Sequence, residues 1–118
     1  MGACLPCLGG GGLKKEITKE GYGPRPEKGQ FCKLRYQGML TSGHVFDQSR
    51  DGFSFELGEG AVIKGWDILV AKMKLGEKAK LTIPPSYGYG SSGAAPAIPP
   101  NATLIFNVEL IEINDTFY

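Results

Sequence analysis

The sequence predicts an α+β domain in which an antiparallel sheet packs its apolar face against a single short helix. Apolar and polar residues alternate along several segments, as they do in strands that face a core on one side and solvent on the other. Only one segment shows the wider spacing of an amphipathic helix. The 118 residues include 8 prolines and 18 glycines, roughly twice the usual glycine share of about 7%, which favours many turns and little helix.

The two-residue period locates the strands, because alternate side chains of a strand point to opposite faces of its sheet. Cys32, Leu34 and Tyr36 share one face of such a strand and alternate with polar residues. The predicted strands are residues 13–19, 31–40, 44–49, 53–57, 78–83 and 103–113. The predicted loops and turns are 20–29, 41–43 and 50–52. The predicted inward-facing residues of the last two strands are Ala79, Leu81, Ile83, Leu104, Phe106, Val108 and Leu110.

The predicted helix begins at Trp66, the only tryptophan of the chain. Trp66, Leu69, Val70 and Met73 recur at the i, i+3, i+4 and i+7 positions, so they form one apolar stripe on a helix. We expect Gly76 to end this helix.

Composition favours one domain over residues 13–118, preceded by a disordered, glycine-rich tail over residues 1–12. The net charge of +1 predicts no large field that would attract nucleic acid or an anionic membrane. No apolar run approaches the roughly 18 residues of a membrane span. Three cysteines without a secretory signal favour free thiols in a reducing compartment, so we expect a cytoplasmic protein.

Two familiar motifs lack the context that their chemistry requires. Gly88, Gly90 and Gly93 spell the dinucleotide pattern G-x-G-x-x-G, but "AAPAIPP" follows and cannot form the helix that would hold a pyrophosphate. Cys4 and Cys7 form C-x-x-C in the tail, without the strand and helix of a redox site and without enough further ligands for zinc. We therefore expect no metal and no cofactor.

The first residues also raise the hypothesis of a lipid anchor. Gly2 could carry a myristoyl group and Cys4 a palmitoyl group, and two acyl chains are what stable anchoring needs. Pro6 counts against it, because the myristoylation motif has Ser or Thr at that position.

The longest segment without periodicity, residues 84–101, is predicted to be a packed functional loop. It holds five prolines together with Tyr87, Tyr89 and Ile98, which are costly to leave in water. The sequence shows no nucleophile motif, and His44 is the only histidine, so a hydrolase is disfavoured. The abundant aromatic residues instead predict either a core or a cup for a small apolar ligand.

Several segments match one family in order and at close to its spacing. They are "YQGML", "FDQSRD", "VIKGWD", "GEKAKLTIPPSYGYG" and "IPPNATLIFNVELIEI". The chain resembles the FKBP-type peptidyl-prolyl cis-trans isomerases, immunophilins that bind rapamycin and tacrolimus, from about residue 13 to about residue 113. The resemblance implies a five- or six-stranded antiparallel sheet wrapped around one short helix. It also implies a monomer that assists protein folding by isomerising X-Pro bonds.

The resemblance further implies a set of site residues. It places Trp66 as the floor under a prolyl ring, and the Ile63 N–H and the Tyr89 hydroxyl as donors to ligand carbonyls. The catalytic residues that it implies are Asp47, Tyr89 and Phe106. The substrate-binding residues that it implies are Tyr36, Phe46, Phe53, Val62, Ile63, Trp66 and Ile98. Asp47 would either orient Tyr36 or interact with the rotating carbonyl carbon.

Partners follow from the same resemblance. They are proline-containing segments of client proteins, macrolide immunosuppressants, and a phosphatase or kinase captured through a drug complex; a membrane enters only if the N-terminus is acylated. Three departures bear on them: a short 50–53 segment that lacks a second basic residue, Ala94, and Ala97, where relatives often carry bulkier side chains. The alternatives that remain are a binding module with the same pocket and a membrane-tethered scaffold.

Overall fold

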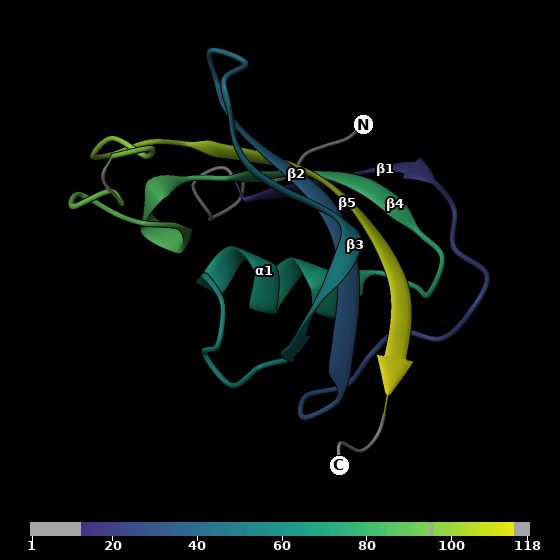
Figure 1. Ribbon diagram of the computed structural model, residues 1–118. Coiled ribbons are helices and arrows are strands. Elements are labelled where there is room, and N and C mark those ends of the chain that lie inside the picture. The colour runs from purple at the N-terminus through teal and green to yellow at the C-terminus, as the bar shows by residue number, and fades with distance from the viewer. Residues whose placement is uncertain (1–12, 95, 115–118) are drawn as a thin grey trace.

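The fold is a five-stranded antiparallel sheet with one short α-helix against its concave side (Figure 1). The computed structural model describes residues 13–94 and 96–114, and α1 is the one α-helix within these ranges. The strand order is β1-β4-β5-β2-β3. The strands are β1 (Lys14–Lys19), β2 (Phe31–Leu40), β3 (Val45–Glu56), β4 (Lys78–Ile83) and β5 (Leu104–Asn114). The helices are α1 (Lys64–Leu69) and the 3-10 turns η1 (Val70–Lys72) and η2 (Pro85–Tyr87). The α+β prediction is confirmed, whereas the predicted tail with Gly2 and Cys4 lies outside the described residues.

The core lies between α1 and the inner face of the sheet. All seven residues predicted to point inward from β4 and β5 are buried, and so are all four of the predicted helical stripe. The helix can approach the sheet because residue 65 is glycine: a Cβ there would lie 2.7 Å from Cγ2 of Ile83 on β4. The two-residue period therefore predicted the core correctly.

The helix is shorter than the stripe predicted. It starts at Lys64 rather than Trp66, and its α-helical hydrogen bonds stop at Leu69, after which η1 tightens the chain into a 3-10 turn. Met73 is already extended, with φ −89° and ψ 148°, so Gly76 does not cap the helix. Gly76 instead lies in the turn before β4 with φ +87°, a conformation that glycine adopts without strain.

The predicted turn at residues 50–52 is wrong, because β3 runs unbroken from Val45 to Glu56. The register passes from the pair Leu34–Phe53 to the pair Tyr36–Ser49, so one residue of β2 faces three of β3. Residues 50–52, which were predicted to form a turn, instead form this bulge, with Gly52 at φ +111°. A bulge increases the local bend of a strand, and this one lies between the segments that carry Phe46 and Phe53.

A buried ion pair fastens the edge strand β1. Glu77 is 1% exposed, and its carboxylate accepts a hydrogen bond from Lys15 Nζ at 2.6 Å and from the Lys74 N–H at 3.1 Å. Lys15 also donates to the Lys72 carbonyl at 3.1 Å. β1 is thereby tied to the segment between η1 and β4 as well as to β4 itself.

Candidate functional site

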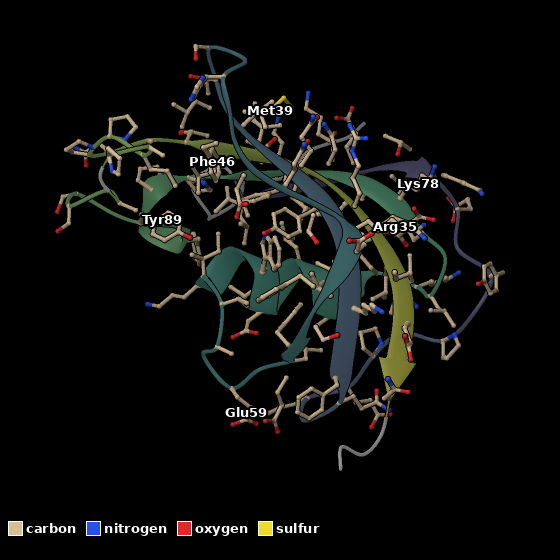
Figure 2. The ribbon with its side chains drawn as sticks, viewed as in Figure 1. Arg35, Met39, Phe46, Glu59, Lys78 and Tyr89 are labelled. Atoms are coloured by element: carbon tan, nitrogen blue, oxygen red, sulfur yellow. The ribbon has the colours of Figure 1, made fainter. Side chains whose placement is uncertain are left out.

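A hollow of about 240 Å³ opens at the end of the molecule where α1 begins. We call it the aromatic hollow, because six of the ten residues that line it are aromatic. Its lining residues are Tyr36, Phe46, Asp47, Phe53, Ala61, Val62, Ile63, Trp66, Tyr89 and Phe106. They come from β2, β3, β5, the start of α1, the segment before it and the 84–101 loop. Figure 2 shows Phe46 and Tyr89 near the same end of the sheet.

Trp66 forms the base of this aromatic cluster. It is only 5% exposed and lies in the first turn of α1. Its ring meets those of Tyr36 and Phe106 edge-on at centroid distances of 5.0 and 5.2 Å. Edge-to-face pairs at such distances are favourable beyond their buried area. Among the described residues nothing accepts a hydrogen bond from the buried Trp66 Nε1, so apolar packing alone holds the indole.

One wall of the aromatic hollow depends on a glycine. Phe46 and Phe106 meet edge-on at 5.7 Å directly above Gly38 of β2. A Cβ at residue 38 would lie 2.7 Å from Phe106 Cε1 and 2.8 Å from Phe46 Cζ. Gly38 was not among the predicted site residues, although a glycine inside a strand is the signal of a close approach.

Asp47 and Tyr36 form a hydrogen-bonded pair in the lining. The Tyr36 hydroxyl donates to Asp47 Oδ2 at 2.8 Å. Burial, followed by this hydrogen bond to a carboxylate, raises the pKa of Tyr36 to about 12, so the phenol stays protonated at neutral pH. Of the two roles that the sequence analysis left open for Asp47, the geometry contains the one that orients Tyr36.

The segment before α1 presents a backbone donor. Ile63 precedes the helix in an extended conformation, and its carbonyl accepts the Trp66 N–H at 3.0 Å. Within residues 13–94 and 96–114, no group accepts a hydrogen bond from the Ile63 N–H itself. This N–H is therefore available to a ligand.

A carboxylate of α1 holds that segment in place, and the sequence analysis missed it. Asp67 accepts hydrogen bonds from the N–H groups of Gly58 and Gly60 at 2.9 and 3.1 Å. Both glycines have positive φ, and they lead directly into the lining residues 61–63. Sequence alone offers only a weak signal for this contact, an acidic residue in the first turn of a helix.

The 84–101 loop brings Tyr89 to the rim. The loop is closed by a bridge between Ala94 and Ile98 and by a hydrogen bond from the Asn101 N–H to the Gly90 carbonyl at 2.9 Å. Tyr89 is 40% exposed, and its hydroxyl has no hydrogen-bond partner among the described residues. The packed loop thus presents a second donor to the aromatic hollow.

Nine of the ten predicted site residues come together in the lining, and Ile98 does not. Ile98 is 6% exposed and belongs to the buried core. Ala61 joins the lining although no pattern pointed to it. In the described part of the chain no group of three or more His, Cys, Asp or Glu side chains could hold a metal. The arrangement can exclude water from a small apolar ligand and donate hydrogen bonds at its rim.

Comparison with known proteins identifies the family. The family model described as "FKBP-type peptidyl-prolyl cis-trans isomerase" matches residues 23–111. "FK506-binding protein 1" of Dictyostelium discoideum is 55% identical over 103 residues, covering 85% of this chain and 96% of that protein. "FK506-binding protein 1A" of Aspergillus fumigatus is 52% identical over 108 residues, with 88% and 96% covered.

A third relative is named for its activity. The "Peptidyl-prolyl cis-trans isomerase" of Schizosaccharomyces pombe is 49% identical over 108 residues, covering 88% of this chain and 96% of that protein. The family match over residues 23–111 includes β2, β3, β4, most of β5 and every residue that lines the aromatic hollow. The chain therefore belongs to the FKBP-type family and is a peptidyl-prolyl cis-trans isomerase.

Proposed function

We propose that the aromatic hollow is the place where this enzyme turns X-Pro bonds. The observation that carries the proposal is a cup of six aromatic side chains with two unengaged donors at its rim, the Ile63 N–H and the Tyr89 hydroxyl. A prolyl ring on Trp66 would leave the preceding carbonyl among Tyr36, Phe46 and Phe106. The rim donors would hold the flanking carbonyls of the peptide.

The physical basis is the loss of amide resonance. Rotation about a peptide bond faces a barrier of about 18–20 kcal/mol, and an X-Pro bond takes tens of seconds or more unaided. The planar amide has a strongly polar carbonyl, whereas the twisted transition state has lost resonance and is less polar at oxygen. A dry aromatic site therefore disfavours the planar forms more than the twisted form, which is differential binding of the transition state. No nucleophile is needed.

Asp47 acts in this scheme through Tyr36. The 2.8 Å hydrogen bond fixes the phenol against the cup, next to the Trp66 ring at 5.0 Å. The high pKa of Tyr36, about 12, keeps the proton in that bond throughout the neutral range. We assign Asp47 a positioning role rather than contact with the rotating carbon.

Phe106→Tyr tests the proposal. Phe106 is 3% exposed, so a new hydroxyl would wet the wall. We expect kcat/KM for a Leu-Pro peptide to fall at least about tenfold, or about 1.4 kcal/mol, while the fold is preserved. Tyr89→Phe should raise KM, and its matched control is Tyr87→Phe, in the same loop but outside the lining. Normal turnover by Phe106→Tyr would remove the catalytic role from this hollow.

We propose as well that macrolides of the rapamycin and tacrolimus type occupy the aromatic hollow. Two of the relatives carry FK506 binding in their names. Residues 50–53 and the loop residues Ala94 and Ala97 would modulate the affinity and the capture of a phosphatase or kinase. A protease-coupled isomerase assay with stoichiometric rapamycin tests this, because unchanged activity would exclude the drug from the hollow. A pure binding module would bind the drug but show no turnover.

For the cellular setting we propose a cytoplasmic monomer acting on proline-containing segments of client proteins. Cys32, in the core, is free and buried, as in a reducing compartment. No helix in the described ranges is long and apolar enough to cross a membrane. Acylation of Gly2 or Cys4 would change the setting, and membrane fractionation of a Gly2→Ala variant tests it.

A further inference from the structure

The face of the sheet that points away from α1 is strongly basic. We call it the outer face. Strand register assigns its members, because paired residues point to the same side. Its basic residues are Lys14, Lys19, Lys33, Arg35, Arg50, Lys78 and Lys80, and its acidic residues are Glu16, Glu56, Glu109 and Glu112. Seven positive charges against four negative ones give an excess of three, although the whole chain carries only +1.

The fold therefore separates charges that the net value conceals. The rest of the chain holds the other 6 basic residues and the other 8 acidic ones, so it is net negative. From the net charge we expected no field that would attract an anionic surface. The alternation of side chains along β1, β2 and β4 produces such a field, because it places lysines and arginines on the outer face.

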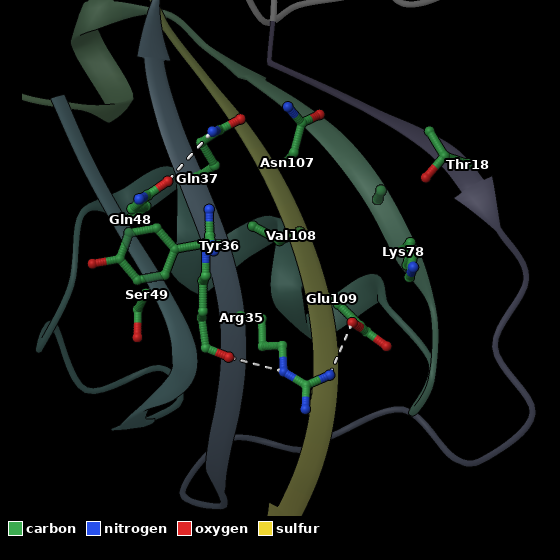
Figure 3. Close-up of a pocket in the computed structure, with 12 residues that line it drawn as sticks. Thr18, Arg35, Tyr36, Gln37, Gln48, Ser49, Lys78, Asn107, Val108 and Glu109 are labelled. Carbon is green, nitrogen blue, oxygen red and sulfur yellow. Dashed lines mark hydrogen bonds and ion pairs between the residues drawn. The ribbon is translucent and has the colours of Figure 1, made fainter. Parts of the chain in front are cut away.

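The basic outer face is hollowed at its centre. A depression of about 300 Å³ lies over β5 and its neighbours, with Arg35 and Lys78 at its sides (Figure 3). Arg35 is engaged there, since it donates to the Arg50 carbonyl at 3.0 Å and pairs with Glu109 at 3.3 Å. Among the described residues, Lys78, Lys80 and the guanidinium of Arg50 form no ion pair. Their charges remain available to a partner.

Apolar side chains adjoin the lysines at one end of the outer face. The row Lys14–Thr82–Ile105–Met39–Val45 crosses all five strands by register. Val45 is 40% exposed, and Met39 and Ile105 are partly exposed. Figure 2 shows Met39 and Lys78 on the side of the sheet opposite α1. Lysines beside a small apolar group are the composition of a membrane-interface surface.

We propose that the outer face docks on an anionic lipid leaflet. A single acyl chain binds membranes only marginally, and a polybasic surface is one of the second signals that make anchoring stable. The outer face supplies such a signal whether or not the tail is acylated. Register places one aromatic residue on this face, Phe31, in the row of Glu56 and Asn114 at the end of β2 far from Met39. The rows that hold Lys78, Lys80 and the apolar group contain no aromatic residue on which a nucleic-acid base could stack, which favours a membrane over single-stranded RNA. The aromatic hollow lies under the inner face, so a docked enzyme keeps its site open to solvent.

Vesicle co-sedimentation of the full, unmodified chain tests the proposal. We expect binding to phosphatidylserine-containing vesicles at low salt, none to pure phosphatidylcholine, and loss in high salt. Each basic residue near an anionic surface contributes about fivefold to partitioning. Lys78→Glu with Lys80→Glu should therefore weaken binding by at least about 25-fold. The matched control is Lys64→Glu with Lys72→Glu, which reverses two exposed lysines of α1 and η1 and should bind within about twofold of the parent.

Three results would overturn the proposal. They are no binding to anionic vesicles at low salt, equal binding to neutral vesicles, and equal loss in the control pair. Tighter binding of a mixed-sequence single-stranded RNA, lost in the same Lys78 and Lys80 variant, would reassign the outer face to nucleic acid. Isomerase activity of each variant reports folding independently, because none of these lysines lines the aromatic hollow.

Discussion

Gly38→Ala should damage the aromatic hollow, although residue 38 is not itself among the residues that line it. A methyl group at residue 38 would lie 2.7 Å from Phe106 Cε1 and 2.8 Å from Phe46 Cζ. Ordinary carbon contacts begin near 3.4 Å, so the two rings must withdraw by roughly 0.7 Å. Both rings belong to the same wall, and neither can retreat without leaving its edge-on contact at 5.7 Å. The substitution therefore reshapes the site through packing alone.

The size of the effect follows from that displacement. Overpacking a core costs about 1–3 kcal/mol, while replacing glycine with alanine returns about 0.5–1 kcal/mol through the unfolded chain. We expect a net destabilisation of about 1–2 kcal/mol, and a fall in Tm of roughly 4 °C for each kcal/mol. Misplacing site groups by about 1 Å can cost about 100-fold in rate, so kcat/KM should fall about 10- to 100-fold.

A protease-free isomerase assay on a Leu-Pro peptide, read beside a urea titration, measures both quantities. Gly21→Ala is the matched control, because its Cβ would lie 2.7 Å from the Leu75 carbonyl oxygen, a contact outside the aromatic hollow. It should lose similar stability and keep its turnover at temperatures where it is folded. If Gly38→Ala kept kcat/KM within twofold of the parent while losing stability, the Phe46–Phe106 wall would not be part of the working site.

Three further substitutions or reactions address other parts of the molecule. Asp67→Asn should raise KM about three- to tenfold with kcat nearly unchanged, because the 58–60 segment loses its charge-assisted hydrogen bonds to the carboxylate. The control is Glu59→Gln, at an exposed residue of the same segment, which should change neither KM nor kcat. Lys15→Ala should lower the free energy of unfolding, measured by urea titration, by about 3 kcal/mol, because it leaves the buried Glu77 carboxylate without its ion-pair partner. Adding Glu77→Gln should recover part of that loss. Burial, with a smaller contribution from the Asp67 charge, raises the pKa of Cys32 to about 11, so peptide-resolved alkylation at pH 8 should modify it only through unfolding. Rapid alkylation of the folded protein would contradict the burial of this thiol. The thiol of the unfolded chain ionises near pH 9. The stabilisation that the raised pKa of Cys32 gives to the fold is therefore complete below pH 9 and disappears as the pH rises toward 11.

Local periodicity predicted the core because burial follows the pleat. Leu81, Ile83, Leu104 and Leu110 are each fully buried, as the alternation required. Periodicity could not distinguish the bulge around Gly52 from a turn, because polar residues and glycine are common in both. Only the pairing of β3 with β2 decides between them, and pairing is a non-local property.

Some residues of the site were predictable from the sequence and others were not. Its aromatic residues were predicted from the family resemblance, which implies that they lie close together in space. Gly38 and Asp67 were not, because each acts on residues that are distant in sequence or in another element. Ile98, which was expected in the lining, is 6% exposed and is not among the residues that line the hollow. The position of a side chain on a non-periodic loop cannot be predicted from spacing.

β2 connects the two surfaces that matter most for function. Its even-numbered residues Leu34, Tyr36 and Gly38 face the core and the aromatic hollow, and its odd-numbered residues Arg35 and Met39 face outward. A strand with a two-residue period keeps these sets apart even though they are adjacent in sequence. Substitutions on one set should leave the surface chemistry of the other unchanged, provided that the backbone register is kept. Catalysis in the hollow and docking through the outer face are therefore separable by mutation within a single strand, and a substitution that altered both would indicate a slipped register rather than a shared site.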